Sequence, residues 1–110
     1  MLDRQQQEPG AVVDVEGCLR RAAHSDVVVL GLRHSGLGSV VAAVLTDGSL
    51  VGRLRKVARR ELSAAQRPRL WFSVDRLPVT RDGAVDRKAL RGLVEAGGPG
   101  VRRLSVTGSR

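Results

Sequence analysis

Aromatic side chains are nearly missing from this sequence of 110 residues, in which Trp71 and Phe72 are the only two and tyrosine does not occur. The hydrophobic core therefore has to be built from valine, leucine and alanine. The scarcity also disfavours single-stranded nucleic acid as a ligand, because proteins of that class stack bases on aromatic rings. One cysteine, Cys18, excludes a disulfide within the chain and indicates a reducing compartment.

Long hydrophobic runs are also missing, since none approaches the roughly 20 apolar residues that span a bilayer. The opening residues, MLDRQQQEPG, are too polar for a signal peptide, so we expect a cytoplasmic protein without a membrane partner. The two histidines, His24 and His34, have no cysteine or carboxylate at metal-ligand spacing. We therefore expect no metal site, and no serine–histidine–aspartate triad.

Acidic residues are few beside the basic ones. The chain has 19 lysines and arginines against 11 aspartates and glutamates, a formal net charge of +8. This balance permits nucleic acid, an acidic protein or an anionic ligand as a partner. The basic residues are spread along the chain, however, which favours an arginine-rich proteome over a dedicated binding surface.

Hydrophobic periodicity predicts a small α+β domain. Val15, Cys18, Leu19 and Ala22 recur at helical spacing, whereas runs such as DVVVLGL indicate buried strands. In chain order we expect a helix over 14–24, strands over 26–32 and 40–46, a helix over 49–65, a strand over 69–74 and a helix over 86–95. This order predicts a small, mainly antiparallel sheet of about three strands, flanked by about three helices.

Composition divides the chain into three parts. Residues 1–13 read as a polar lead-in that contains the breakers Pro9 and Gly10. Residues 14–96 contain the expected helices and strands and form one domain, which suits the length of the chain. Residues 97–110 form a tail rich in glycine and arginine, which either adds a short edge strand or stays loose.

The stretch LPVTRDGAVDRKAL, residues 77–90, resembles a signature of the small C-terminal domain of adenylate-forming enzymes. These enzymes include acyl-CoA synthetases, luciferases and the adenylation domains of nonribosomal peptide synthetases. The signature positions that fit are Leu77, Pro78, Thr80, Gly83, Val85, Asp86, Arg87 and Leu90. The segments VEGCLRRA, VVVLGL, GLGSVVAAVLT and RPRLWFSVDRLP fit the family pattern as well. The resemblance covers residues 3–90 approximately and implies the fold expected above.

Ala84 is the main departure, because the family has a lysine after the glycine of this signature. The resemblance implies that the lysine reaches the active site of a much larger N-terminal domain, where it contacts the substrate carboxylate and the nucleotide. A methyl group cannot stabilise the charge that develops there. Lys88 lies inside the following helix and should point elsewhere, which leaves Arg81 as the one plausible replacement. We expect no catalytic residue in the signature loop Arg81, Asp82, Gly83, Ala84, Val85 and Asp86.

Other family positions have changed too. Ser39 follows Gly38 where the family usually has glutamate, and Arg67 keeps only the charge of a family lysine. Asp3 and Gly10 match the family's hinge acid and the loop glycine after it, but little else of that motif remains. No Walker-type glycine loop is present, so the chain should bind no cofactor by itself. ATP or AMP, and CoA or a phosphopantetheine carrier, would come only with a large-domain partner.

Three functions follow as hypotheses. The first is a stand-alone, non-catalytic domain that binds an adenylating large domain or an acidic acyl-carrier protein through the basic residues Arg53, Lys56, Arg59, Arg60 and Arg67. The alternative interpretation of that surface is an ordinary solvated helix face. The second is the small part of a split or truncated acyl ligase, in which Ala84 could be a deliberate lysine replacement; the changed hinge and turn favour natural erosion. The third, a basic nucleic-acid-binding domain, lacks any recognisable motif. Self-association is also expected, because such a domain exposes the apolar surface that a larger partner covers.

Overall fold

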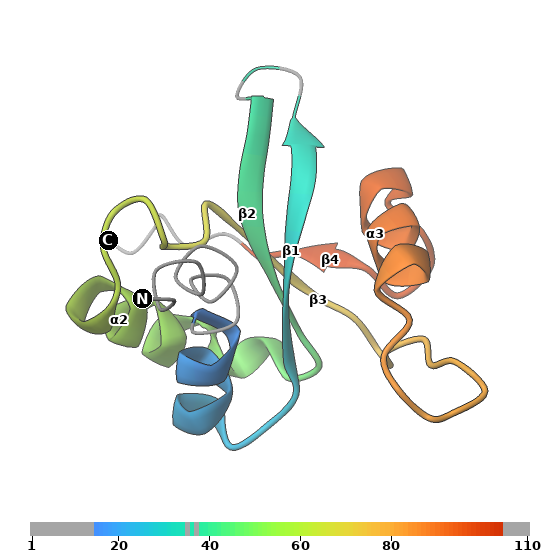
Figure 1. Ribbon diagram of the computed structural model, residues 1–110, viewed down its shortest axis with the longest axis horizontal. Helices are drawn as coiled ribbons and strands as arrows, with labels where there is room; N and C mark the ends of the chain where they lie inside the picture. The colour runs from blue at the N-terminus through green and yellow to red at the C-terminus, as the bar shows by residue number, and fades with distance from the viewer. Residues whose placement is uncertain (1–14, 35, 37, 105–110) are drawn as a thin grey trace, which may run out of the picture.

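A four-stranded sheet with the strand order β1-β2-β3-β4 forms the centre of the protein (Figure 1). The computed structural model describes residues 15–34, 36 and 38–104. A helix over residues 15–23 comes first. The other elements are β1 (Val27–His34), β2 (Gly38–Leu45), the 3₁₀ turn η1 (Gly48–Leu50), α2 (Val51–Glu61), β3 (Leu70–Ser73), α3 (Arg87–Ala96) and β4 (Arg102–Arg103).

Two of the three strand pairings are antiparallel, so the predicted fold class is confirmed. β1 and β2 form a hairpin whose register runs from Val27 opposite Leu45 to His34 opposite Gly38. β2 and β3 are parallel, because the chain returns through η1 and α2 before it enters β3, and parallel neighbours require a crossover of this kind. β4 pairs antiparallel with β3 through two residues of the predicted tail.

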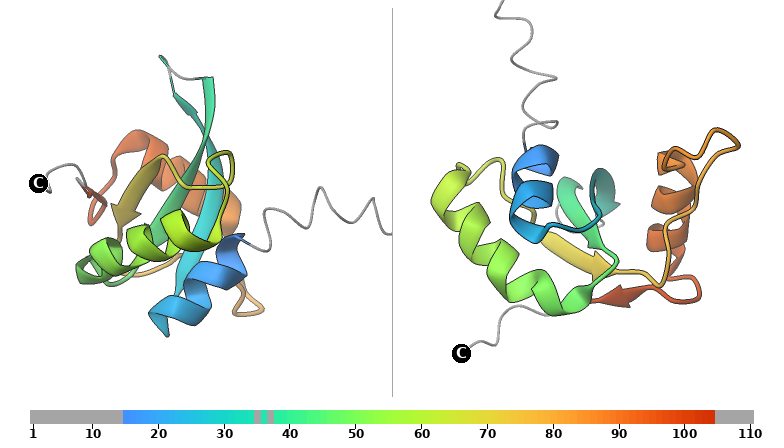
Figure 2. Two further views of the ribbon diagram at one scale, coloured as in Figure 1. Left: turned by 90° about the vertical axis from the view of Figure 1, so that its left-hand side faces the viewer. Right: turned by 90° about the horizontal axis from the view of Figure 1, so that it is seen from below.

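The sheet is covered on both faces. The helix of residues 15–23 and α2 lie against one face, and α3 lies against the other (Figure 2). Alternate residues of each strand therefore enter two separate hydrophobic clusters. The first cluster receives Val27, Val29, Ala43, Leu45 and Trp71 from the sheet, and the second receives Val28, Leu30, Ala42, Val44 and Phe72. Burial on both faces explains why β1 begins as an unbroken run of valines.

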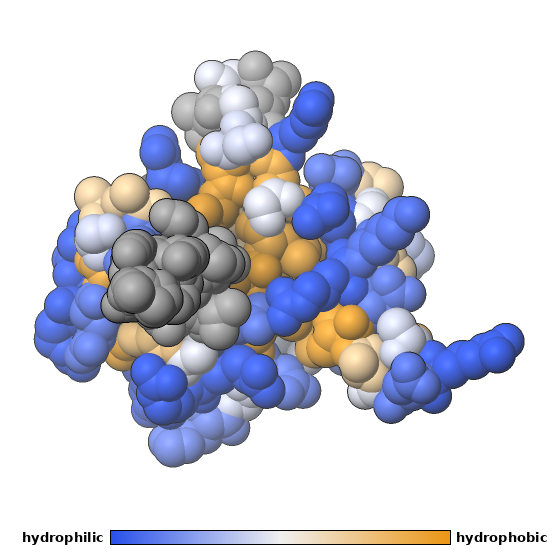
Figure 3. All heavy atoms as spheres, in the orientation of Figure 1, coloured by the Kyte–Doolittle hydropathy of each residue, from blue (hydrophilic) through white to orange (hydrophobic). Residues whose placement is uncertain are grey.

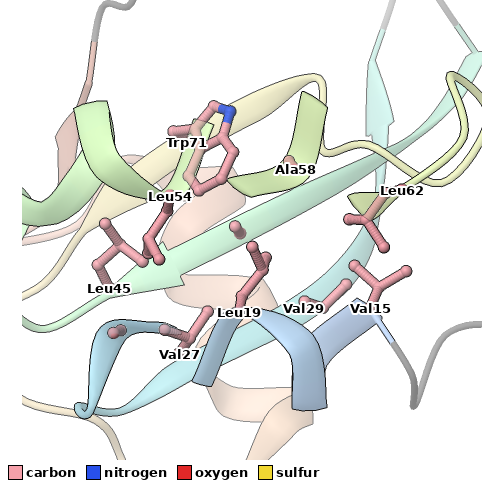
Figure 4. Close-up of a cluster of buried hydrophobic side chains, with 11 residues drawn as sticks. Val15, Leu19, Val27, Val29, Leu45, Leu54, Ala58, Leu62 and Trp71 are labelled. Carbon is pink, nitrogen blue, oxygen red and sulfur yellow. The ribbon is translucent and has the colours of Figure 1, made fainter. Parts of the chain in front are cut away.

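The first cluster joins the two helices on its face of the sheet. Leu19 and Leu54, both fully buried, meet the strand residues there, and the indole of Trp71 lies over Leu54 (Figure 4). Leu62 closes the cluster at the end of α2. Burial of one such leucine contributes about 1.5–3 kcal/mol. The core on this face is therefore mainly aliphatic, as the composition predicted, and it includes the one tryptophan of the chain.

α2 is shorter than the helix expected over 49–65. Asp47 caps the 3₁₀ turn η1 that precedes α2: its carboxylate accepts from the Ser49 backbone N–H at 3.0 Å and from the Ser49 hydroxyl at 2.6 Å. The helix ends at Glu61. There the Arg67 guanidinium donates to the carbonyls of Ala58, Arg59 and Leu62. These carbonyls lie at the end of the helix, where backbone groups lose their helical partners; that of Ala58 also accepts from the Leu62 N–H at 2.9 Å.

Glycine residues form the turn that leads the chain from α3 back to the sheet. Gly97 ends α3 with a left-handed φ of 64°, the conformation in which glycine is favoured. A Cβ on Gly98 would collide with Leu93, and one on Gly100 would lie 2.8 Å from an Asp75 carboxylate oxygen. The tight return allows β4 to pair with β3, so residues 102–103 form the edge strand.

Candidate functional site

The signature loop between β3 and α3 is closed by its own backbone. Val79 and Val85 form an antiparallel bridge. The N–H of Thr80 donates to the carbonyl of Ala84 at 2.8 Å, and the N–H of Gly83 donates to the carbonyl of Thr80 at 2.9 Å. The N–H of Asp86 donates to the carbonyl of Pro78, also at 2.9 Å, at the base of the loop. The loop is therefore a small hairpin with a defined tip.

Two signature residues explain why the chain folds in this way. Gly83 has a φ of 85°, which is costly for any residue with a Cβ. Asp86 caps α3, since its carboxylate accepts from the Ala89 N–H at 3.0 Å. Both residues are among the signature positions that fit the family pattern. These two residues therefore give the loop its shape.

Ala84 is exposed at the tip of this loop, beside Val79, which is 60% exposed. Both residues line an open hollow of about 750 Å³. The wall of the hollow also carries three arginines and two aspartates, which are Arg20, Arg76, Arg87, Asp26 and Asp75. A side chain at position 84 therefore meets a charged depression in which the two signs nearly balance.

Neither Arg81, the one replacement cation considered, nor Lys88 contributes to this hollow. Arg81 and Lys88 are exposed and are not among the residues that line it. Arg20 and Arg76 do line it, which no sequence pattern indicates. They lie far apart in the chain, on the first helix and just after β3, so no local spacing relates them. Only the packing of the loop against these two elements brings them together.

Arg87, the signature arginine after the loop, fastens α3 to the rest of the domain. Its Nη2 lies 2.7 Å from Oε1 of Glu16, and its Nη1 donates to the carbonyl of Val29 at 3.3 Å. Oε2 of Glu16 in turn accepts from the Val29 N–H at 2.7 Å. Arg87 thus joins the helix of residues 15–23, the outer edge of β1 and the start of α3.

The electrostatics of this pair favour the charged forms. Burial alone raises the pKa of Glu16, but hydrogen bonds from Arg87 and from the Val29 N–H outweigh it, so the pKa lies below its ordinary value of 4.5. The hydrogen bond to Glu16 raises the pKa of Arg87, against a smaller opposing effect of burial. Arg87 is therefore held as a structural contact of the loop.

The predicted basic surface lies on α2, on the other side of the sheet from α3. Its members Arg53, Lys56, Arg59 and Arg60 are all exposed, and Arg60 lies 3.7 Å from the carboxylate of Glu61. Arg67, grouped with them by charge, is only partly exposed and uses its guanidinium on the end of α2. The hinge candidates Asp3 and Gly10 lie outside the described residues.

Two further findings concern the described residues only. No group of three or more histidine, cysteine, aspartate or glutamate side chains within residues 15–34, 36 and 38–104 is placed to hold a metal ion. In the same part of the chain, no helix has both the length and the apolar character to cross a bilayer.

Comparisons place the fold in a known group. The sequence matches no family model and no curated protein. Among solved structures, it is 27% identical to an acyl-CoA synthetase from Brucella canis (78% of this chain, TM-score 0.64). It is 28% identical to a benzoate CoA ligase from Burkholderia xenovorans LB400 (73% of this chain, TM-score 0.60). A fatty acyl CoA synthetase from Mycobacterium tuberculosis has the same fold, with 21% identity over 77% of this chain and a TM-score of 0.67.

The matched region is a minor part of each enzyme. This chain spans 18% of the length of each of the three proteins, in the region of their small C-terminal domain. The resemblance that began from residues 77–90 therefore extends over the fold. The fold of this chain is therefore that of the small C-terminal domain of adenylate-forming enzymes, and the matched structures support a place in that superfamily.

Proposed function

We propose that this domain does not catalyse a reaction by itself and acts by binding another protein in acyl or aminoacyl activation. The observation that carries the proposal is Ala84, a methyl group at the exposed tip of an otherwise well-formed loop. In enzymes that the loop resembles, this position supplies a cation to the reacting groups. Loss of one such donor typically costs about 3–4 kcal/mol, or roughly 10²–10³ in rate.

The hollow beside Ala84 offers no clear substitute for that cation. Arg20 and Arg76 face it together with Asp26 and Asp75, so a developing negative charge there would meet carboxylates as well as guanidinium groups. Arg87 is already bound to Glu16 at 2.7 Å. These surroundings support a loop that has kept its shape for contact with a partner and has lost its part in chemistry.

The proposed partner is acidic. The net charge of +8 favours approach to a negative surface, and α2 presents four exposed basic residues with only Glu61 as an acidic neighbour on the helix. An acyl-carrier protein, with its phosphopantetheine arm, fits this surface. An adenylating large domain, which would bring ATP or AMP and CoA, fits the loop side. Because α2 and α3 lie on opposite faces of the sheet, one domain has room for both contacts (Figure 2).

A charge-reversal experiment tests the carrier contact. The variant carries Arg53→Glu and Arg59→Glu, and its control carries the same number of charge reversals, Arg102→Glu and Arg103→Glu, on β4, which is also exposed. Binding of a phosphopantetheine-loaded acyl-carrier protein is measured by isothermal titration calorimetry at two salt concentrations. We expect the α2 variant to weaken binding at least about tenfold more than the control, with the wild-type affinity falling as salt rises. Equal losses in both variants would mean that only net charge matters.

The split-ligase alternative is tested separately, since the intact backbone of the loop is also compatible with it. Wild-type protein and Ala84→Lys are each combined with an adenylating large domain that lacks its own small domain, and pyrophosphate exchange is measured. Exchange supported by the wild type would contradict a non-catalytic domain. Exchange supported only by Ala84→Lys would show that the loop is correctly placed and that the lost cation removed its activity.

The nucleic-acid alternative makes a different prediction. Any protein with this charge binds DNA more weakly as salt rises, so salt dependence alone decides nothing. A preference for one sequence or one nucleic-acid structure, measured at constant salt, would support it against the protein-binding proposal.

A further inference from the structure

Two arginine side chains of α3 cover the outer edge of β1. β1 is the first strand in the order β1-β2-β3-β4, so in the described part of the chain this edge has no neighbouring strand. Nη1 of Arg87 donates to the Val29 carbonyl at 3.3 Å, and Nε of Arg91 donates to the Gly31 carbonyl at 3.1 Å. The Val29 N–H donates to Oε2 of Glu16 at 2.7 Å. Side chains therefore bind backbone groups that another strand would use.

The spacing of the two arginines matches the spacing of the carbonyls that they bind. Arg87 and Arg91 are four residues apart on α3, which is about 6 Å along a helix. Val29 and Gly31 are two residues apart on β1, which is about 6.6 Å along a strand. In the space-filling view, hydrophilic side chains lie between the hydrophobic residues of the hairpin and α3 (Figure 3). One turn of α3 thus places one guanidinium at each of two successive outward carbonyls.

The rest of this edge is suited to pairing with another strand. In an antiparallel pair the backbone groups of alternate residues face the partner, so Val29, Gly31 and Arg33 face outward from the sheet. Within residues 15–34, 36 and 38–104, nothing binds the N–H of Gly31 or the N–H and carbonyl of Arg33. Gly31 is exposed, and a Cβ there would meet no atom within 4 Å. No side chain therefore obstructs the approach of another backbone at this position.

We propose that the outer edge of β1 is a dimerisation surface for a second copy of this chain, and that Arg87 and Arg91 block it. With the arginines removed, a two-fold axis at Gly31 sets this glycine opposite the same glycine of the second copy. Val29 then lies opposite Arg33 of the second copy. In this antiparallel register the two glycines exchange two backbone hydrogen bonds. The N–H of each Arg33 donates to the Val29 carbonyl that Arg87 occupies in the single chain.

The charges along the edge favour a second copy as the partner in this register. Directly opposed residues share a face of the sheet, so the Arg33 side chain of one copy lies beside Val29 of the other. The carboxylate of Glu16 is bound to the Val29 N–H, and it loses its guanidinium partner when Arg87 is removed. Arg33 of the second copy supplies a new guanidinium, and the two-fold axis forms the same contact twice.

Sedimentation equilibrium of the full chain tests the proposal, which does not depend on the proposed function. The variant carries Arg87→Ala and Arg91→Ala. Its control carries Arg81→Ala and Lys88→Ala, which remove the same charge from exposed positions on and beside α3. We expect the mass of the variant to rise from 11.8 kDa toward twice that value at protein concentrations that leave the wild type and the control unchanged. Circular dichroism should confirm that the fold remains.

A further substitution identifies the surface through which the variant pairs. Proline lacks the N–H that an added strand needs, and an edge strand tolerates proline where that N–H faces solvent. Gly31 does not have a positive φ, and its Cβ position is open, so proline fits there in the single chain. Gly31→Pro, added to the double variant, should therefore return the protein to the monomer.

Three results would overturn the proposal. One is a folded double variant that associates no more than the wild type. If Arg87→Ala unfolds the domain, Arg91→Ala alone gives the same test, because Arg91 is exposed and its removal still frees the Gly31 carbonyl. Another is a dimer that persists after Gly31→Pro, which would place the interface elsewhere. The third is equal association of the control, which would assign the effect to the lost charge.

Discussion

Removing the Glu16–Arg87 contact should reveal how much it contributes to stability. Glu16 is 13% exposed and Arg87 49% exposed, with 2.7 Å between their charged atoms. Glu16→Ala deletes two short charge-assisted hydrogen bonds and leaves the Val29 N–H without its acceptor. Hydrogen bonds to charged groups contribute about 1.5–3 kcal/mol each. Arg87 is half exposed, so solvent weakens its hydrogen bond to Glu16. We therefore expect Glu16→Ala to lower the free energy of unfolding by about 2–3 kcal/mol.

Arg87→Ala should cost less, about 1–2 kcal/mol, because Glu16 then keeps the Val29 N–H and gains water. The double variant should cost about 1 kcal/mol less than the sum of the single changes, which measures the coupling of the pair. Urea unfolding followed by the fluorescence of Trp71, the one tryptophan and a core residue, reports the transition. Lys88→Ala is the matched control on α3 and should change stability by less than about 0.5 kcal/mol. A coupling below about 0.3 kcal/mol, or an equal loss in the control, would refute the reasoning.

Four other predictions concern single features. Asp86→Ala should lower the free energy of unfolding by about 1 kcal/mol, because the cap to Ala89 is lost; chemical denaturation measures it. Gly83→Ala should cost about 1–2 kcal/mol in the same assay, from the φ of 85° alone, since its Cβ would enter open space; no loss would contradict the loop geometry. Leu54→Ala should cost about 2–5 kcal/mol, because this fully buried side chain leaves a cavity. Because the pKa of Glu16 is lowered on folding, its contribution is complete above about pH 4.5 and is lost as pH falls through the folded value; unfolding curves of wild type and Glu16→Gln should therefore converge in acid.

Local sequence patterns predicted the helices, the strands and the shape of the loop between β3 and α3. Gly83 and Asp86 act through neighbours a few residues away, so a turn and a cap were readable from the sequence. The same holds for the hairpin, whose strands are joined by a short glycine-bearing connector. The resemblance in residues 77–90 gave the correct fold because its positions are the ones that shape the backbone.

Long-range contacts were not predictable in this way. Glu16 and Arg87 are 71 residues apart, and a single opposite-charge pair has no periodicity to detect. Charge also does not reveal where a side chain points: Arg67 was grouped with the exposed cations of α2, whereas its guanidinium binds three carbonyls at the end of that helix. The parallel pairing of β2 with β3 depends on the path of α2 across the sheet, which residue patterns alone do not determine.

The contacts that hold α3 in place have a consequence for the order of folding. Its arginines reach β1 across 58 and 60 residues of chain, whereas the β1–β2 hairpin closes across a short loop. Since distant contacts form only after long loops have closed, α3 should dock late and detach early. Each time α3 detached, Val44 and Phe72 would become exposed to solvent, while the hydrophobic cluster on the other face of the sheet would remain buried. Transient release of this one helix therefore gives the folded domain a direct route to aggregation.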